Sequence, residues 1–203
     1  FDGDADRLVV VDEKGTPIGC DLLMALMVPY FLAKNPGSVI VYDLRSSRAV
    51  RECIEANGGK AVMSRVGHAF IKAQMREHDA IFAGELSGHY YFKENYTAES
   101  QGLAFLLLAN LVCRTKRRVS ALVEPLRKYH ASGEINSRVA DPAAVIARIK
   151  AQYGAAGRMF ELDGVSVEFP DWWFNVRTSN TEPLLRLIVE ADTAEKMVAE
   201  RDR

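Results

Sequence analysis

Short apolar runs alternate with helix-like stretches through the first half of the chain. Strands are predicted at residues 39–42, 60–64 and 80–83, each apolar and bounded by turn-forming residues. Helices are predicted at residues 21–34, from a cap at Ser46 or Ser47 to 56, and at 69–77, 98–114 and 120–129. A run at 8–11 followed by a turn at 13–15 predicts a hairpin. Strands that alternate with helices favour βαβ units, so we expect parallel strands here.

The pattern changes at residues 131–133, where an Ala-Ser-Gly segment interrupts the alternation. Beyond it, strands are predicted at 134–139, 165–169, 172–177 and 184–190, and helices at 143–153 and from about Thr193. Short turns between the last strands predict an antiparallel sheet with helices on one face. We expect a domain boundary near residue 131, and Trp172 and Trp173 in the core of the second part.

The composition excludes several classes of protein. The chain has 203 residues, a formal net charge of −1 and 48% hydrophobic residues. This balance argues against disorder and gives no electrostatic footprint for nucleic acid or anionic lipid. The longest apolar run, 103–112, is far below the ~18 residues that span a membrane. Three distant cysteines lack zinc or redox spacing, so we expect them reduced and buried in a cytoplasmic protein.

Both ends of the sequence suggest part of a longer protein. The chain starts at Phe1 without a methionine, and its candidate chemistry begins at the next residue. It stops at Arg203 inside a predicted helix.

The first loop carries a carboxylate at every second position: Asp2, Asp4 and Asp6. Three hard oxygen ligands this close suit Mg²⁺ or Ca²⁺. An EF-hand is excluded, because Arg7 stands where that loop needs glycine and a strand follows where a helix is required. A haloacid-dehalogenase-type Asp-x-Asp phosphatase loop and an acidic turn without metal remain as alternatives.

Two further loops offer groups for a sugar phosphate. Gly84–His89 follows an apolar strand, and its Glu85 and Ser87 suit paired sugar hydroxyls. The loop at 177–183 joins two strands and supplies a guanidinium, hydroxyls, an amide and backbone N–H groups, the inventory of a phosphate cradle. Taken singly, each is also compatible with an ordinary polar turn.

Together and in this order, the segments Phe-Asp-Gly-Asp-Ala-Asp-Arg (1–7), Gly-Glu-Leu-Ser-Gly-His (84–89) and Arg-Thr-Ser-Asn-Thr-Glu-Pro (177–183) resemble the α-D-phosphohexomutase family, in its phosphomannomutase/phosphoglucomutase branch. The resemblance implies an α/β protein cut from a four-domain fold. Residues 1–18 would end an α/β domain 2 with the metal loop. Residues 19–131 would form a sugar-binding domain 3 with βαβ units and a mixed sheet. Residues 132–203 would form a truncated, phosphate-binding α+β domain 4 with an antiparallel sheet.

The resemblance also implies an activity. Family members interconvert hexose 1-phosphates and hexose 6-phosphates of mannose or glucose through a phosphoserine and a hexose 1,6-bisphosphate. No serine here carries the flanking residues of the phosphoserine loop, so the missing N-terminal domains would supply it and the chain alone would be inactive. A non-catalytic sugar-phosphate-binding module and a metal-dependent phosphatase are the alternative functions.

The residue roles implied by the resemblance fall into three groups. The metal ligands for Mg²⁺ would be Asp2, Asp4 and Asp6, and the catalytic residues Arg7 and His68. The substrate-binding residues would be Arg45, Glu85, Ser87, His89, Arg177, Ser179, Asn180 and Thr181.

Overall fold

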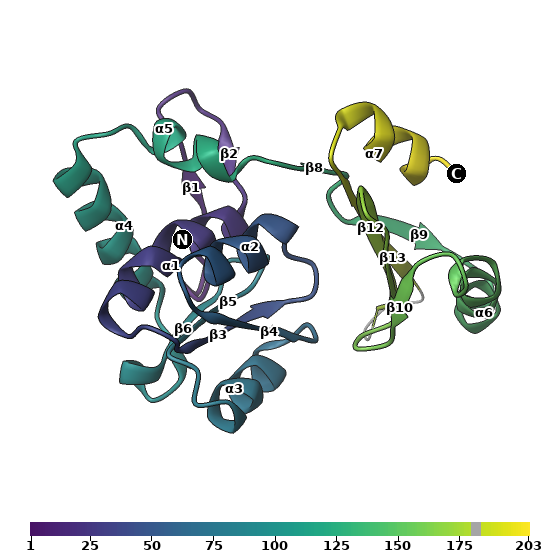
Figure 1. Cartoon of the computed structure of the whole chain (residues 1–203), viewed down its shortest axis with the longest axis horizontal. Coiled ribbons are helices and arrows are strands. Elements are labelled where there is room, and N and C mark those ends of the chain that lie inside the picture. Colours follow the sequence, from purple (N-terminus) through teal and green to yellow (C-terminus); the bar gives the residue numbers. More distant parts are fainter. Residues whose placement is uncertain (180–183) are drawn as a thin grey trace. The chain divides into compact units, whose positions relative to one another are not determined.

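The structure is a computed structural model that describes residues 1–179 and 184–203 (Figure 1). The chain divides into two compact units, Phe1–Arg127 and Lys128–Arg203. Each unit has its own hydrophobic core.

The first unit contains a small hairpin and a five-stranded sheet. Its elements are β1 (Val10–Val11), β2 (Pro17–Ile18), α1 (Cys20–Lys34), β3 (Val39–Asp43), α2 (Arg48–Ala56), β4 (Lys60–Ser64), α3 (His68–Glu77), β5 (Phe82–Gly84), β6 (Tyr90–Phe92), the 3₁₀ turn η1 (Lys93–Asn95), β7 (Ala98–Glu99), α4 (Gln101–Thr115), α5 (Val119–Val123) and the 3₁₀ turn η2 (Glu124–Leu126). The sheet order is β4-β3-β5-β6-β7. The first three are parallel, while β6 and β7 run antiparallel to their neighbours. The prediction of βαβ units is confirmed, and the sheet is mixed as expected.

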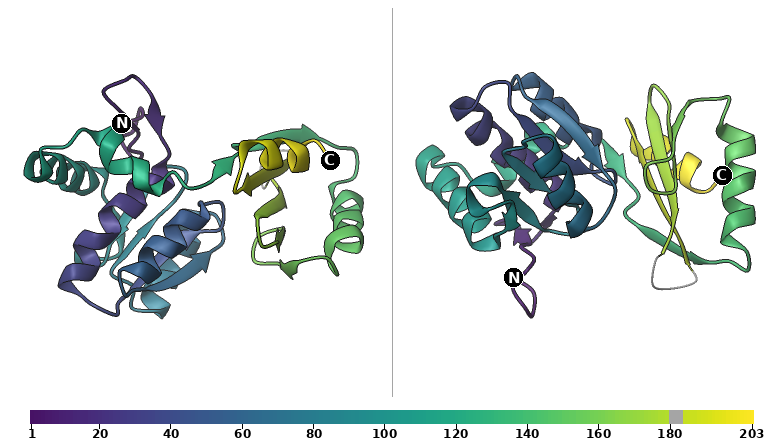
Figure 2. Two further views of the ribbon diagram at one scale, coloured as in Figure 1. Left: turned by 45° about the horizontal axis from the view of Figure 1, so that its top comes forward. Right: turned by 90° about the horizontal axis from the view of Figure 1, so that it is seen from below.

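Helices cover both faces of this sheet, with α1 and α2 on one side and α3 on the other (Figures 1 and 2). In β3, Ile40 faces the cluster that includes α1 and α2, while Val41 faces the cluster that includes Ile71 of α3. Burial on both faces explains the continuous apolar run of this strand. Because β3, β4 and β5 are parallel, their carboxyl ends lie at one edge of the sheet, where the segments with Arg45, His68 and Glu85 begin.

Two predicted helices are shorter in the structure. Residues 98–99 form β7, and α4 begins at Gln101, because the side chain of Ser100 accepts a hydrogen bond from the Leu103 N–H and caps the helix. The helix predicted at 120–129 ends at Val123, and a 3₁₀ turn containing Pro125 follows it. The predicted strand at 80–83 begins two residues later, at Phe82.

The second unit is an antiparallel sheet with two helices. Its elements are β8 (His130–Ala131), β9 (Ile135–Arg138), α6 (Pro142–Tyr153), β10 (Arg158–Phe160), β11 (Val165–Glu168), β12 (Trp172–Thr178), β13 (Leu184–Ala191) and α7 (Ala194–Arg201). The order is β10-β11-β12-β13, and β13 also pairs with β8 and β9. Tyr153 of α6 and Met197 of α7 join one apolar cluster, which confirms helices on one face. Both tryptophans are buried, as predicted.

The prediction that all three cysteines are buried is wrong for Cys113. Cys20 is buried and Cys53 is half-buried, but Cys113 lies on the exposed side of α4. That helix turns only a narrow face, including Ala104 and Leu108, towards the core.

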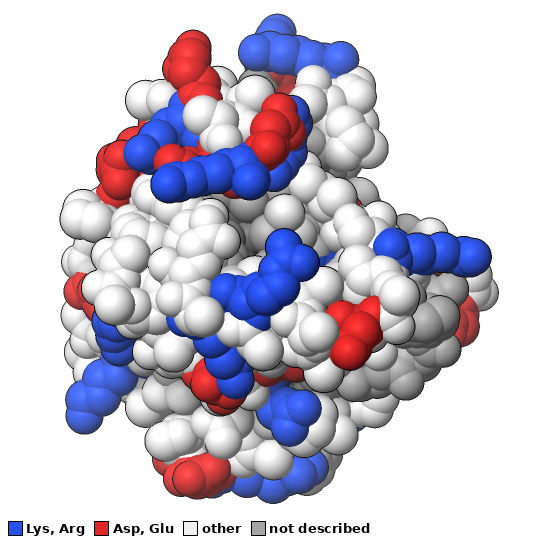
Figure 3. Space-filling model, turned by 90° about the vertical axis from the view of Figure 1, so that its right-hand side faces the viewer, with Lys and Arg blue, Asp and Glu red and all other residues white. Residues whose placement is uncertain are grey.

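Charged side chains of both signs are interspersed over the face of the molecule drawn in Figure 3. In the part of the chain that the structure describes, no helix combines the length and the apolarity needed to cross a membrane.

Candidate functional site

The aspartate loop brings its three carboxylates together. One oxygen from each of Asp2, Asp4 and Asp6 lies within 4.8 Å of the others. Ala5 adopts a left-handed conformation with φ +61°, and its N–H donates to the Asp2 carbonyl at 3.2 Å. This backbone conformation is unfavourable for alanine by ~1–2 kcal/mol, and it curls the loop so that alternate side chains converge. Arg7 closes the loop, since its N–H donates to Asp2 Oδ1 at 3.1 Å.

The donor set fits a hard divalent cation. Asp6 Oδ1 is shielded from solvent and has no hydrogen-bond partner within the described structure. The hydrogen bond from His89 holds the pKa of Asp6 below its ordinary value, with a smaller contribution from Arg7. Arg7 Nε lies 3.4 Å from Asp2 Oδ2 and 3.7 Å from Asp6 Oδ1, which leaves the cluster with excess negative charge. An ionised oxygen without a donor, in a cluster of carboxylates, is what a metal ligand requires.

The sugar loop, 84–89, lies against the aspartate loop. His89 Nε2 lies 3.3 Å from Asp6 Oδ2, and His89 Nδ1 lies 2.8 Å from Ser87 Oγ. The Leu8 N–H donates to the Gly88 carbonyl at 3.0 Å. Gly88 has φ +93°, and a Cβ there would stand 3.0 Å from the Leu8 carbonyl oxygen, so glycine permits this close approach. The structure therefore joins two loops that the sequence places about eighty residues apart.

Glu85 is buried and held on both sides of its carboxylate. The Tyr91 hydroxyl donates to Glu85 Oε1, and the Arg45 guanidinium Nη2 lies 4.0 Å from Oε2. Burial raises the pKa of Tyr91, so this phenol stays protonated and remains a donor. The loop itself is closed by the Glu85 N–H, which donates to the His89 carbonyl at 2.9 Å. Glu85 thus has a fixed orientation at the end of β5.

Asp43, at the end of β3, fixes the position of Arg45. Its Oδ1 accepts from the Arg45 N–H at 2.7 Å and from Arg45 Nε at 3.3 Å. Its Oδ2 accepts from Arg45 Nη2 at 2.7 Å and from the Leu86 N–H at 2.9 Å. This buried carboxylate therefore holds both the guanidinium and the loop that carries Glu85. Asp43 and Tyr91 were not singled out by the sequence, because their roles depend on partners in other elements.

His68 lies at the same edge of the sheet, as the first residue of α3 after β4. It is exposed. Since β4 is the parallel neighbour of β3, the loop with His68 adjoins the loop with Arg45. The first unit thus gathers the predicted metal, sugar and histidine positions at one edge.

In the second unit, Arg177 and Arg186 stand opposite each other on β12 and β13. Glu134 bridges them: its Oε2 accepts from Arg177 Nη2 at 2.6 Å, and its Oε1 accepts from Arg186 Nη1 at 3.1 Å. Arg186 Nη2 also donates to Ser179 Oγ at 3.4 Å. The sequence did not identify Arg186 or Glu134 as parts of this cradle. Asn180 and Thr181, which it did identify, lie outside the described residues.

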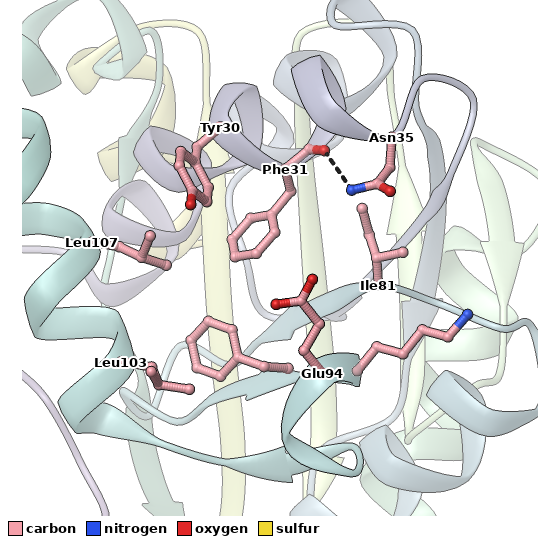
Figure 4. Close-up of a pocket in the computed structure, with 9 residues that line it drawn as sticks. Tyr30, Phe31, Asn35, Ile81, Glu94, Leu103 and Leu107 are labelled. Atoms are coloured by element: carbon pink, nitrogen blue, oxygen red, sulfur yellow. Dashed lines mark hydrogen bonds between the residues drawn. The ribbon is translucent and has the colours of Figure 1, made fainter.

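An apolar pocket of about 540 Å³ lies elsewhere in the first unit (Figure 4). Tyr30 and Phe31 of α1 face Leu103 and Leu107 of α4 across it, with Glu94 at its edge. None of the predicted site residues that the structure describes lines it.

Comparison with known proteins gives two family matches. Residues 20–129 match the alpha/beta/alpha domain III of phosphoglucomutase/phosphomannomutase, and residues 134–203 match the C-terminal domain of the same family. A phosphomannomutase of Salmonella typhimurium is 45% identical over 193 residues, covering 94% of this chain and 42% of that protein. The chain therefore spans about two fifths of the length of this curated relative.

Solved structures show the same fold. A phosphoglucomutase/phosphomannomutase family protein from Burkholderia thailandensis is 31% identical with a TM-score of 0.87, covering 100% of this chain and 44% of that one. An N-acetylphosphoglucosamine mutase from Aspergillus fumigatus, crystallised with GlcNAc-6P and magnesium, is 16% identical with a TM-score of 0.65, covering 98% of this chain and 49% of that one.

Proposed function

This chain belongs to the phosphoglucomutase/phosphomannomutase family, and we propose that it forms the metal-, sugar- and phosphate-binding part of an enzyme that interconverts hexose 1-phosphates and hexose 6-phosphates. The observation that carries the proposal is the aspartate cluster, linked through His89 to the sugar loop. A cation site next to hydroxyl-binding groups suits phosphoryl transfer to a sugar hydroxyl.

Asp2, Asp4 and Asp6 would hold Mg²⁺, which would neutralise charge on the transferring phosphoryl group when bound. Arg7, already against this cluster, would steady the same phosphoryl oxygens. The magnesium in the Aspergillus mutase of the same fold supports the choice of metal. These residues supply charge and position, while the phosphoryl donor would be a phosphoserine outside this chain.

Glu85, Ser87 and His89 would bind the sugar. The Glu85 carboxylate, held by Tyr91 and beside Arg45, accepts hydrogen bonds from hydroxyls, while Ser87 can donate or accept. We assign Arg45 and His89 to substrate binding, and His68, exposed at the same edge, to proton transfer at the reacting hydroxyl.

Arg177 and Ser179 would bind the phosphate that does not react, together with Asn180 and Thr181 of the same loop. Arg186, hydrogen-bonded to Ser179, adds a second guanidinium to this group. Glu134 keeps the two guanidiniums adjacent by neutralising part of their repulsion.

In this reaction, the phosphoserine gives its phosphoryl group to the free hydroxyl of a hexose monophosphate. The resulting hexose 1,6-bisphosphate reverses its orientation in the site and returns its other phosphoryl group to the serine. We propose that residues 1–18 end a preceding domain, with 19–131 and 132–203 as the next two. The serine would lie in the part of such enzymes that this chain does not span. The cytoplasm, where thiols stay reduced, is the proposed compartment.

Calorimetry on the 203-residue chain tests the site. Glucose 1-phosphate and mannose 1-phosphate would be titrated with and without Mg²⁺, and Mg²⁺ would be titrated alone. We expect the wild-type chain to bind Mg²⁺ and the Asp4→Asn variant to lose this binding. Asp79→Asn, at an exposed carboxylate paired with Lys93 outside the cluster, should leave it unchanged.

Two results would overturn the proposal. The first is the absence of sugar-phosphate binding at millimolar ligand. The second is sustained release of inorganic phosphate by the chain alone, which would indicate a phosphatase.

A further inference from the structure

Gln101 lies between the metal loop (residues 2–7) and the sugar loop (84–89). Its side-chain Nε2 donates to the Asp6 carbonyl at 2.5 Å, and its Oε1 accepts from the Tyr90 N–H at 3.2 Å. The residue is only 3% exposed. One amide thus satisfies a backbone acceptor in the first loop and a backbone donor directly after the second.

The position of this amide is itself fixed. Gln101 is the first residue of α4, directly after the capping Ser100, whose N–H donates to the Tyr90 carbonyl at 3.0 Å. The start of α4 is therefore hydrogen-bonded to both the N–H and the carbonyl of Tyr90 in β6. A buried backbone group left without a partner is costly, so the amide cannot withdraw without a penalty to both loops.

The other links between the loops are of two kinds. The N–H of Leu8, directly after the metal loop, donates to the Gly88 carbonyl at 3.0 Å, and His89 joins Asp6 to Ser87 through its two ring nitrogens. The His89 link runs through side chains that are proposed to bind ligands, so a ligand would compete with it. The Gln101 amide instead bonds to backbone groups of both segments, so its link does not use the side chains proposed to bind ligands.

We propose that Gln101 is a positioning residue that couples the two loops, so that a divalent cation and a sugar phosphate bind with positive cooperativity. The inference rests on the proposed function of the loops. A cation held by Asp6 fixes the backbone to which the amide donates, and through the amide it fixes the start of β6 beside His89. The sugar phosphate then binds to a loop that is already ordered, so its binding costs less conformational entropy. By reciprocity, each ligand tightens the other by the same factor.

Calorimetric titration of Mg²⁺, with and without saturating glucose 1-phosphate, measures this factor once the direct interaction of the two ligands has been subtracted. We expect glucose 1-phosphate to tighten Mg²⁺ binding at least ~5-fold, the lower end of common coupling factors. Gln101→Met, of similar length but without the amide, should bring the factor close to one. Gln101→Glu keeps the acceptor for Tyr90 but loses the donor to Asp6, and should do the same. Gln74→Met, at an exposed amide bonded to Glu77 in α3, is the matched control.

Hydrogen exchange gives a second readout that needs no ligand. Gln101→Met should speed exchange in peptides covering 2–8 and 84–90 and leave β3 and β4 protected. Wild-type protein that binds both ligands without coupling, or Gln101→Met with coupling intact, would overturn the inference and leave the proposed function standing. Wild-type protein that binds neither ligand would overturn both.

Discussion

Replacing Asp43 by asparagine tests whether one buried carboxylate organises the sugar-binding edge. Each of its oxygens accepts one backbone N–H and one guanidinium N–H: Oδ1 from Arg45 N and Nε, Oδ2 from Leu86 N and Arg45 Nη2. The asparagine side chain of the variant would present one oxygen and one NH₂ group. Whichever way the amide is turned, its NH₂ group faces two donors, so two of the four bonds are lost and become donor–donor contacts.

The expected cost follows from the burial of this pair. Asp43 is fully buried, and the Arg45 side chain is 10% exposed, so neither charge regains much water when the other is removed. Breaking a buried ion pair by neutralising one partner costs about 3–5 kcal/mol. Domains are stable by about 5–15 kcal/mol, so the first unit should still fold while its unfolding shifts to much lower urea.

Two optical signals separate the units in a urea titration. Both tryptophans of the chain lie in the second unit, so their fluorescence reports on that unit, whereas far-UV circular dichroism reports on both. Asp43→Asn should move the dichroism transition and leave the fluorescence transition nearly unchanged. Asp79→Asn, at a side chain that is 82% exposed, should change neither. A loss below about 1 kcal/mol in Asp43→Asn would refute the assigned hydrogen bonds.

Two further predictions concern stability. Burial raises the pKa of Asp21, so the folded chain binds more protons than the unfolded chain and stability falls as pH rises through the folded pKa. Between about pH 4 and pH 7, the free energy of unfolding of Asp21→Asn should rise relative to the wild type, and a difference independent of pH would contradict this. Gly164 has φ +69°, and a Cβ there would stand 2.2 Å from the Val176 carbonyl oxygen. Gly164→Ala should destabilise the second unit by about 1–3 kcal/mol more than Gly133→Ala, which has a similar φ and open space, as followed by tryptophan fluorescence; equal losses would contradict the steric account.

The elements predicted best are those whose own residues decide them. β3 is a largely buried apolar run and β4 a half-buried one, each next to turn residues, and the predicted ranges agree with the structure to within a residue. The two helices of the second unit also agree, because Pro142 and Thr193 mark helix starts locally. β7 and β8 were missed, since each has only two residues and is defined by its pairing, β7 with the neighbouring β6 and β8 with the distant β13.

The candidate site divides in the same way. Asp2, Glu85 and Arg177 were proposed from the sequence because their residue types stand in short loops with spacing that suits a cation, a sugar or a phosphate. Their supports were not: Asp43 meets Leu86 across 43 positions, and Glu134 meets Arg177 across the same separation. Such pairs leave no periodic pattern that the sequence could reveal.

The sequence alone thus indicated which loops could bind metal, sugar or phosphate, and which segments form most of the helices and strands, because these properties depend on neighbouring residues. The tertiary structure decided which loops meet and what holds each charged group in place. The physical reason is that a hydrogen bond such as Gln101 to Asp6 depends on strand order, register and burial, which bring together groups separated by ninety-five positions. Only the folded chain sets those distances.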